Sequence, residues 1–214
     1  MRIKYRDYGQ FVVELSRFKG TSRINIKNEM TRMRLEMDRE LELVKDKNPE
    51  TVQGARAFYE YVCGRLDAHG DETLYRVFAH GDFHLFNLFK TDAGMKLIDW
   101  EGVGEQSLLY DFFNYFFSHL WVERTKDDLA EEVMQAIEDM AARLERGNSE
   151  LAASLREKRE LYLMMFYLER IHALATVFRS SPKSFQVWLN VYRNFEENWR
   201  RLLPEQPRAV VGAG

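Results

Sequence analysis

The segments His80-Gly81-Asp82-Phe83-His84-Leu85-Phe86-Asn87 and Leu97-Ile98-Asp99-Trp100-Glu101 decide how this chain is interpreted. Two short apolar runs, Phe86 to Lys90 and Met95 to Ile98, flank Thr91-Asp92-Ala93-Gly94, which is a turn sequence. The runs therefore predict a small antiparallel hairpin. The polar residues of both segments stand where the predicted strands begin or end.

Three polar side chains are expected to converge at one end of this hairpin. Antiparallel pairing brings Asn87 and Asp99 to the same end, with Asp82 in the loop that enters it. Carboxylate and amide oxygens are the ligands that Mg²⁺ prefers, and Mg²⁺ keeps waters that phosphate oxygens can replace. A carboxylate left free of metal can take a proton from an attacking hydroxyl, and phosphoryl transfer depends mainly on such positioning and charge neutralisation. The spacing from Asp82 to Asn87 also matches that of the catalytic Asp and the metal-binding Asn in protein kinases.

The chain resembles the aminoglycoside phosphotransferase and choline kinase-like family. That family's catalytic loop reads His-Gly-Asp-x-His-x-x-Asn, and its metal motif reads Ile-Asp-Trp or Ile-Asp-Phe, often followed by an acid. Both motifs occur here in order, although Leu85-Phe86 replaces the commoner Pro-Gly. The resemblance implies that Asp82 is the catalytic base, that Asn87 and Asp99 bind Mg²⁺, and that Asp111 supports the catalytic loop.

Three further residues of the two motifs are expected to support the site. We interpret His80 as a hydrogen-bond donor that organises the loop. His84 is expected to be either structural or substrate-facing. Glu101 is either an acid that supports the metal site or a solvated side chain, and the residues leave these alternatives open.

The rest of the chain predicts a mainly α protein that carries one small hairpin. Apolar residues recur at helical spacing in several segments, which are 28–47, 52–69, 108–122, 129–144 and 185–203. A further long helix is expected between Ser149, as its N-cap, and Ser180-Ser181-Pro182, where it ends. Residues 102–107 contain Gly-x-Gly but no second βα unit follows, so we interpret them as a flexible loop after Asp99. With the resemblance, residues 28–203 are expected to form the C-terminal lobe of a protein-kinase-like fold, and 204–214 a frayed tail.

The N-terminal lobe of such a kinase is expected to be absent. Residues 1–27 are too few for a five-stranded lobe, and they contain no glycine-rich loop. They can supply a hinge or the remnant of a strand, for which Phe11 to Leu15 is the candidate, and neither Lys4 nor Lys19 is a convincing phosphate lysine. The chain is then a fragment of a longer kinase, a lobe that works with another chain, or a lobe that binds without catalysis.

The composition limits which binding partners and which cellular compartment are expected for this chain. The 31 Lys and Arg against 34 Asp and Glu give a net charge of −3, which favours neither nucleic acid nor an anionic membrane as a partner. The apolar run Phe112 to Val122 is shorter than the ~20 residues of a membrane span. A single cysteine, Cys63, and the lack of a signal sequence predict a cytoplasmic protein. Apolar surface left by the absent lobe predicts self-association or a partner.

The function predicted from these observations is a Mg²⁺-dependent small-molecule kinase. It would move the γ-phosphate of ATP or GTP to a hydroxyl of a small acceptor. One alternative is a catalytically incomplete lobe that acts as a binding module or needs a partner lobe. A less favoured alternative is a metal-dependent phosphoesterase with His80, Asp82 and His84 as ligands.

Overall fold

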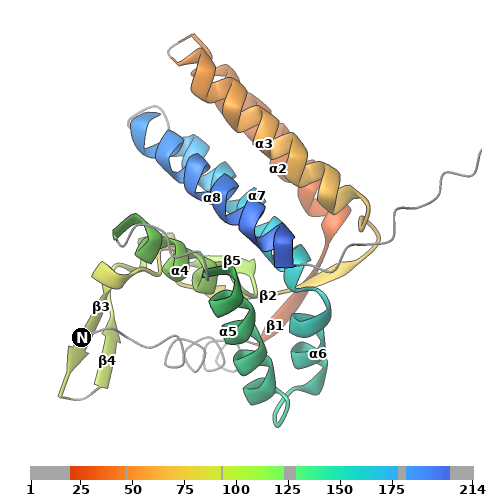
Figure 1. The fold of residues 1–214 in the computed structure, drawn as a ribbon, viewed down its shortest axis with the longest axis vertical. Helices are drawn as coiled ribbons and strands as arrows, with labels where there is room; N and C mark the ends of the chain where they lie inside the picture. The colour runs from red at the N-terminus through yellow and green to blue at the C-terminus, as the bar shows by residue number, and fades with distance from the viewer. Residues whose placement is uncertain (1–19, 47, 93, 123–128, 178–181, 203–214) are drawn as a thin grey trace, which may run out of the picture.

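The computed structural model describes residues 20–46, 48–92, 94–122, 129–177 and 182–202 (Figure 1). Its elements run in the order β1 (Thr21–Asn25), α2 (Ile26–Glu42), α3 (Pro49–Asp67), β2 (Thr73–Ala79), the 3₁₀ turn η1 (Leu85–Asn87), β3 (Leu88–Thr91), β4 (Gly94–Leu97), the 3₁₀ turn η2 (Trp100–Gly102), β5 (Gly104–Ser107), α4 (Tyr110–Val122), α5 (Leu129–Leu144), α6 (Ser149–Glu157), α7 (Arg159–Val177) and α8 (Pro182–Leu202). Helices thus dominate the described chain, as predicted. None of the described helices is long and apolar enough to cross a membrane.

The strands form two separate antiparallel sheets. The predicted hairpin is confirmed as β3–β4, with Leu88 opposite Leu97. A second sheet, which the sequence analysis did not predict, has the order β1-β2-β5. The hairpin lies on the side of the molecule away from α2 and α3, which pack beside α7 and α8 (Figure 1).

The two outer strands of the three-stranded sheet come from segments that the sequence analysis did not firmly assign to a strand. Residues 21–25, expected to belong to a hinge or strand remnant, pair along β2 with Thr21 opposite Val77. The interpretation of residues 102–107 as a flexible loop is wrong, because they form the end of η2 and strand β5, in which Gly104 lies opposite Ala79. The sequence of β5 is Gly-Glu-Gln-Ser, which has little intrinsic preference for a strand, so its pairing with β2 determines its conformation. Phe11 to Leu15, Lys4, Lys19 and the tail from 204 lie outside the described residues.

Asparagine side chains begin three of the helices. Asn25, Asn48 and Asn148 each accept a hydrogen bond from a backbone N–H three residues further on, at 3.1, 3.4 and 3.0 Å. Such caps satisfy an N–H group that has no partner within the helix. The prediction that Ser149 is an N-cap is therefore wrong, because Asn148 caps α6 and Ser149 is its first residue. The long helix expected from Ser149 is also interrupted at Lys158, which separates α6 from α7.

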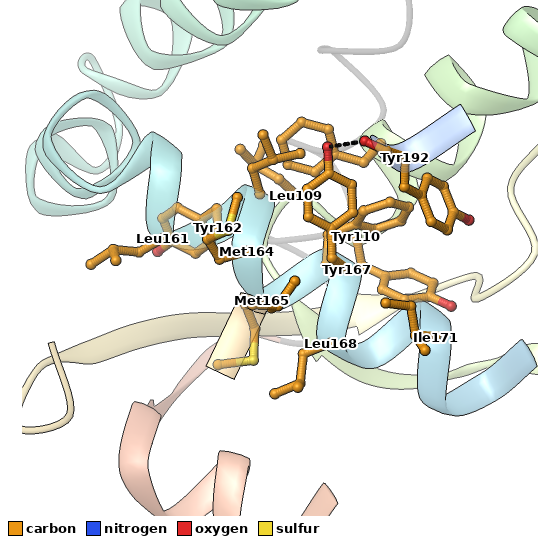
Figure 2. Close-up of a cluster of buried hydrophobic side chains, with 14 of the residues drawn as sticks. Leu109, Tyr110, Leu161, Tyr162, Met164, Met165, Tyr167, Leu168, Ile171 and Tyr192 are labelled. Atoms are coloured by element: carbon orange, nitrogen blue, oxygen red, sulfur yellow. Dashed lines mark hydrogen bonds between the residues drawn. The ribbon is translucent and has the colours of Figure 1, made fainter. Parts of the chain in front are cut away.

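Helix α7 lies at the centre of the apolar core. Its side chains pack against the beginning of α4 and against α8 (Figure 2), and the labelled core residues are Leu109, Tyr110, Leu161, Tyr162, Met164, Met165, Tyr167, Leu168, Ile171 and Tyr192. The polar end of Tyr162 is satisfied, because its hydroxyl accepts the Tyr75 N–H at 3.0 Å and lies 2.9 Å from Ser154 Oγ. The core thereby fixes β2, which ends at Ala79, directly before His80.

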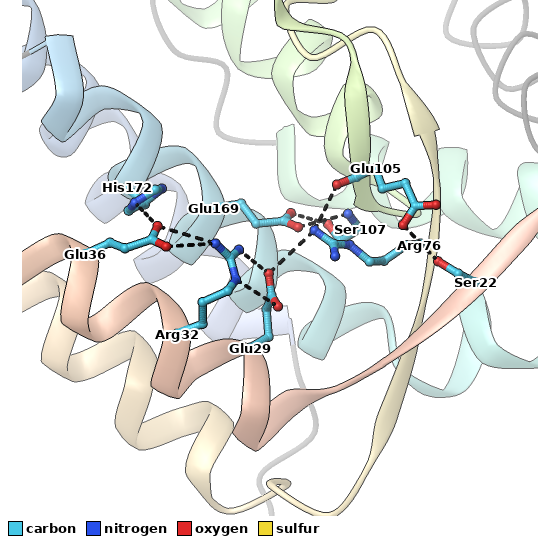
Figure 3. Close-up of polar contacts among 9 residues, drawn as sticks. All are labelled: Ser22, Glu29, Arg32, Glu36, Arg76, Glu105, Ser107, Glu169 and His172. Carbon is cyan, nitrogen blue, oxygen red and sulfur yellow. Dashed lines mark hydrogen bonds and ion pairs between the residues drawn. The ribbon is translucent and has the colours of Figure 1, made fainter.

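A chain of polar contacts joins α2, β2, β5 and α7 (Figure 3). Arg32 and Arg76 both reach Glu29, at 2.5 and 3.5 Å. Beside these contacts, the buried Glu169 of α7 accepts the N–H of Ser107 on β5 at 3.0 Å and the Ser107 hydroxyl at 2.6 Å. Burial raises the pKa of Glu169 to about 7, although the Ser107 hydrogen bonds lower it. These contacts hold the polar strand β5 in place.

Candidate active site

Asp111 holds the loop that follows β2. It lies in the first turn of α4 and is buried. Its Oδ2 accepts the His80 N–H at 2.6 Å, and its Oδ1 accepts the Gly81 N–H at 2.9 Å. Burial raises the pKa of Asp111 to about 7, while the two N–H donors act in the opposite direction because they favour the carboxylate. The contact agrees with the supporting role that the resemblance implies for Asp111.

The His80 ring connects the two motifs. Its Nδ1 lies 3.3 Å from the Asp82 N–H group, which donates to it, and its Nε2 lies 2.9 Å from the Ile98 carbonyl oxygen. An accepting Nδ1 leaves the proton of the neutral ring on Nε2, which donates to Ile98. Burial lowers the pKa of His80 and so favours this neutral form. The His80 ring thus joins the Asp82 loop to Ile98, and its role in the site stays a prediction.

These contacts argue against the phosphoesterase alternative. Both ring nitrogens of His80 are engaged within the protein, and the residue is fully buried, so it has no nitrogen to offer a metal. Among the described residues, no group of three or more His, Cys, Asp or Glu side chains is arranged to hold a metal ion. The ligand set predicted for Mg²⁺ is of another kind, because one of its two members is the amide oxygen of Asn87.

Gly81 and Gly102 bring the two motif loops into backbone contact. Gly81 has φ +83°, and a Cβ added there would lie 1.9 Å from the Gly102 carbonyl oxygen. A Cβ at Gly102 would lie 3.3 Å from the Gly81 carbonyl carbon. The sequence analysis missed Gly102 because it assigned this glycine to a flexible loop. The available signal was a glycine in or just after each motif, a pattern typical of close backbone approach.

Asn87 is in direct contact with Asp82. Its Nδ2 donates to the Asp82 carbonyl oxygen at 3.0 Å and to Asp82 Oδ2 at 3.3 Å. The backbone carbonyl oxygen of Asn87 accepts the Ile98 N–H at 3.0 Å, and this bond joins the loop to the end of β4. The sequence analysis expected Asn87 near the start of the first strand of the hairpin, but Asn87 is the last residue of η1. Because the amide nitrogen is used internally, the side-chain oxygen is the group left to bind a cation.

Asp99 is the one non-glycine residue with positive φ in the described part of the chain. Its φ and ψ are 62° and 65°, and its side chain makes no capping hydrogen bond to η2. Aspartate adopts this left-handed conformation more readily than most non-glycine residues, and non-glycine residues with such φ and ψ are concentrated at functional sites. The next residue, Trp100, supports the turn, because its Nε1 donates to the Leu97 carbonyl oxygen at 3.0 Å and its ring meets the His80 ring edge-on.

The two remaining predicted residues lie beside this cluster. His84 Nε2 lies 3.2 Å from Asp82 Oδ2. Glu101 lies within η2, but its side chain is outside the described part of the structure. The structure thus brings Asp82, Asn87, His80 and His84 together and puts Asp99 at the same end of the hairpin. Their chemical roles stay predictions.

The architecture is that of a kinase-like phosphotransferase lobe. Strand β2 leads into the Asp82 loop, the hairpin β3–β4 leads to Asp99, and helices form the body. The sequence model of the APH family, described as "Phosphotransferase enzyme family", matches residues 4–146, and the chain belongs to this family. Among solved structures, the chain is similar to one described as "Glucosamine kinase (crystal form B)", with a TM-score of 0.53 and 18% sequence identity.

That likeness covers 93% of this chain and 53% of the other, so this chain spans about half the length of the glucosamine kinase. At this level of identity it shows the fold alone. No curated protein matches the sequence.

Proposed function

We propose that this chain is the lobe of a Mg²⁺-dependent small-molecule kinase that carries the proton acceptor and the metal ligands. The observation that carries the proposal is the joined cluster of Asp82 and Asn87, with the left-handed Asp99 at the same end of the hairpin. Membership of a phosphotransferase family supports the same class of reaction. ATP or GTP is the proposed phosphate donor.

The donor groups fit a magnesium ion. Asn87 uses its amide nitrogen on Asp82, so its oxygen remains for a cation, and the Asp99 carboxylate makes no capping contact. Such oxygen ligands suit Mg²⁺, which typically keeps waters and phosphate oxygens as its other ligands. When bound, the ion would neutralise charge on the phosphates during transfer.

Asp82 is the group proposed to act on the acceptor. Its carboxylate would accept the proton of the attacking hydroxyl while that oxygen bonds to the γ-phosphorus and the nucleoside diphosphate leaves with the bridging oxygen. Asp111 and His80 fix the backbone that leads into it, through the His80, Gly81 and Asp82 N–H groups. Catalysis of this kind depends on positioning, so a rigid loop is what the reaction requires.

Calorimetric titration of the chain with ATP, with and without Mg²⁺, tests this proposal. In Asp99→Ala the Mg²⁺-dependent binding is expected to disappear, because a metal ligand is lost. Asp82→Asn is expected to retain binding and to lose turnover by about 10²- to 10⁴-fold, since it removes the proton acceptor.

A matched control for Asp99→Ala is Asp92→Ala, because Asp92 is an exposed aspartate at the turn end of the same hairpin. Binding in the control is expected to equal that of the wild type. Equal loss of binding in the Asp82 and Asp99 variants would contradict the two roles.

A second candidate is a lobe that works with a partner or only binds ligands. Five large apolar side chains near the hairpin are exposed: Phe86, Phe89, Ile98, Trp100 and Val103. Exposed apolar groups gathered in one region favour an interface with a second lobe or a second copy. Sedimentation velocity on the wild type and on Phe89→Ser tests this, because the variant is expected to weaken any association. Monomeric wild type that binds and turns over nucleotide would contradict the candidate.

The proposed compartment is the cytoplasm. The one cysteine, Cys63, is a buried free thiol, and such a thiol suits a reducing environment. The acceptor is proposed to be a small hydroxyl compound.

A further inference from the structure

We infer that Glu169 is a positioning residue for the proposed reaction, because it fixes strand β5, and both ends of β5 lead to groups that hold the loop before Asp82. This inference deepens the proposed function and rests on it. Glu169 belongs to neither motif and lies on α7, and both of its carboxylate oxygens bind Ser107 (Figure 3).

Strand β5 lies at the edge of its sheet. The order β1-β2-β5 leaves it paired on one side only among the described strands. The Leu108 N–H donates to the Tyr75 carbonyl oxygen at 3.0 Å, so the N–H of Ser107, one residue earlier, points away from β2. A buried N–H group without a partner is costly. The outer edge of β5 therefore needs an acceptor that no strand of this sheet supplies.

Side chains take the place of a neighbouring strand on this edge. Glu169 Oε1 accepts the Ser107 N–H at 3.0 Å, and Glu169 Oε2 accepts the Ser107 hydroxyl at 2.6 Å. On the same strand, the Glu105 carbonyl oxygen accepts a hydrogen bond from Arg76 Nη2 at 2.9 Å. Ser107 and Glu169 are 0% and 3% exposed, so bulk water does not compete for their bonds. Glu169 thus ties β5 to the central helix α7.

The position of β5 matters for the site because groups at both of its ends hold Gly81. Just before the strand, the Gly102 backbone is so close that a Cβ added to Gly81 would lie 1.9 Å from the Gly102 carbonyl oxygen. Just after the strand, Asp111 in the first turn of α4 accepts the Gly81 N–H at 2.9 Å. A shift of β5 would move both groups against Gly81, which directly precedes the proposed base Asp82.

Two substitutions separate the hydrogen bonds of Glu169 from its charge. Ser107→Ala removes the hydroxyl, so Glu169 Oε2 loses its donor. Glu169→Gln removes the charge but can keep both contacts, because its amide oxygen can accept the Ser107 N–H and its amide nitrogen can donate to Ser107 Oγ. Tyr61→Phe is a matched control between α3 and α8, because it deletes another hydroxyl that donates to a buried glutamate, Glu196, at 2.6 Å.

Hydrogen exchange of the full chain, followed by NMR at the His80 and Gly81 amides, gives a readout that needs no activity. Both amides donate to the same buried carboxylate. In Ser107→Ala they should exchange about tenfold faster than in the wild type, because the loop opens locally more often. Glu169→Gln and Tyr61→Phe should stay close to the wild-type rate. Unchanged exchange in Ser107→Ala, or equal acceleration in Tyr61→Phe, would overturn the inference.

Steady-state kinetics with Mg²⁺-ATP and a screened acceptor gives the second readout. Because misplacement of a reacting group acts on the chemical step, kcat should fall by about tenfold in Ser107→Ala, and the KM for nucleotide should change by less. Glu169→Gln and Tyr61→Phe should keep most of the wild-type kcat. A Glu169→Gln variant as impaired as Ser107→Ala would contradict the inference, because the charge of Glu169 and not its hydrogen bonds would then matter.

The two readouts keep the inference apart from the proposed function. A wild type without turnover in which Ser107→Ala still frees the two amides would contradict the proposed function and support the role of Glu169. Turnover that Ser107→Ala leaves intact, with unchanged exchange, would have the opposite meaning. If the alanine variant does not fold, Ser107→Cys gives the same comparison with a smaller effect, since a thiol is a weaker donor.

Discussion

At Gly81 a side chain would meet the backbone of the opposite loop. An added Cβ would lie 1.9 Å from the Gly102 carbonyl oxygen, and φ is +83°. Gly81→Ala should therefore lower the free energy of unfolding by about 3 kcal/mol or more, because a left-handed conformation and overpacking both cost energy. Urea denaturation measures this change.

Gly64→Ala is a matched control for that variant. Gly64 lies in α3, and a Cβ there meets nothing within 4 Å. The helix should gain about 0.5 to 1 kcal/mol from the alanine. Similar stability of the Gly81 and Gly64 variants would mean that the two loops can separate without cost.

The polar residues of the site were predictable one by one, but their contacts were not. The motif spacing indicated Asp82, Asn87 and Asp99, and hairpin pairing predicted that the last two share an end. The left-handed Asp99 and the acceptor role of His84 Nδ1 were not predictable, because both depend on short-range backbone geometry in loops. Gly102 was missed because its partner, Gly81, is distant in sequence.

Among the elements, α6 offers a sharp test of how a helix begins. Asn148 accepts the Leu151 N–H at 3.0 Å, whereas Ser149 is already inside the helix. Asn148→Ala should destabilise the protein by about 1 kcal/mol, and Ser149→Ala should change stability by much less. Thermal unfolding followed by circular dichroism compares them. A larger loss in the Ser149 variant would contradict the assignment of the cap.

Helices with clear periodicity were predicted to within a few residues, whereas the three-stranded sheet was not. Strands β1 and β5 are short and polar, and their conformation depends on pairing with β2 and on partners such as Glu169. Local preference carries little information about such strands. The break at Lys158 escaped prediction for a similar reason, because apolar spacing continues on both sides of it.

For the whole molecule, the buried Glu169 makes stability depend on pH. Its pKa is raised to about 7 by burial, from an ordinary value near 4.5, so the folded state binds more protons than the unfolded state between these values. The contribution is complete below pH ~4.5 and is lost as pH rises through about 7, by up to about 3 kcal/mol. Glu169→Gln stays neutral and should flatten the fall in unfolding free energy over this range.

Denaturant titrations at several pH values would compare Glu169→Gln with Glu132→Gln, a change of an exposed glutamate on α5. The Glu132 variant should follow the wild-type curve. A remaining slope of the same sign is expected in the Glu169 variant, because burial also raises the pKa of Asp111. Parallel curves for wild type and Glu169→Gln would show that Glu169 is ionised throughout.

The contact between Gly81 and Gly102 brings the two ends of residues 82–101 to one point, and Phe83 anchors the segment to the helical body because it is buried against Tyr115 of α4. The segment between the two glycines contains η1, the hairpin β3–β4 and the first two residues of η2. A segment whose ends touch can be exchanged with little change in the closure entropy of the chain. We therefore expect that the corresponding segment of a family member can be grafted between the two glycines if its residue 83 still packs on Tyr115 and Asp111 still holds the loop.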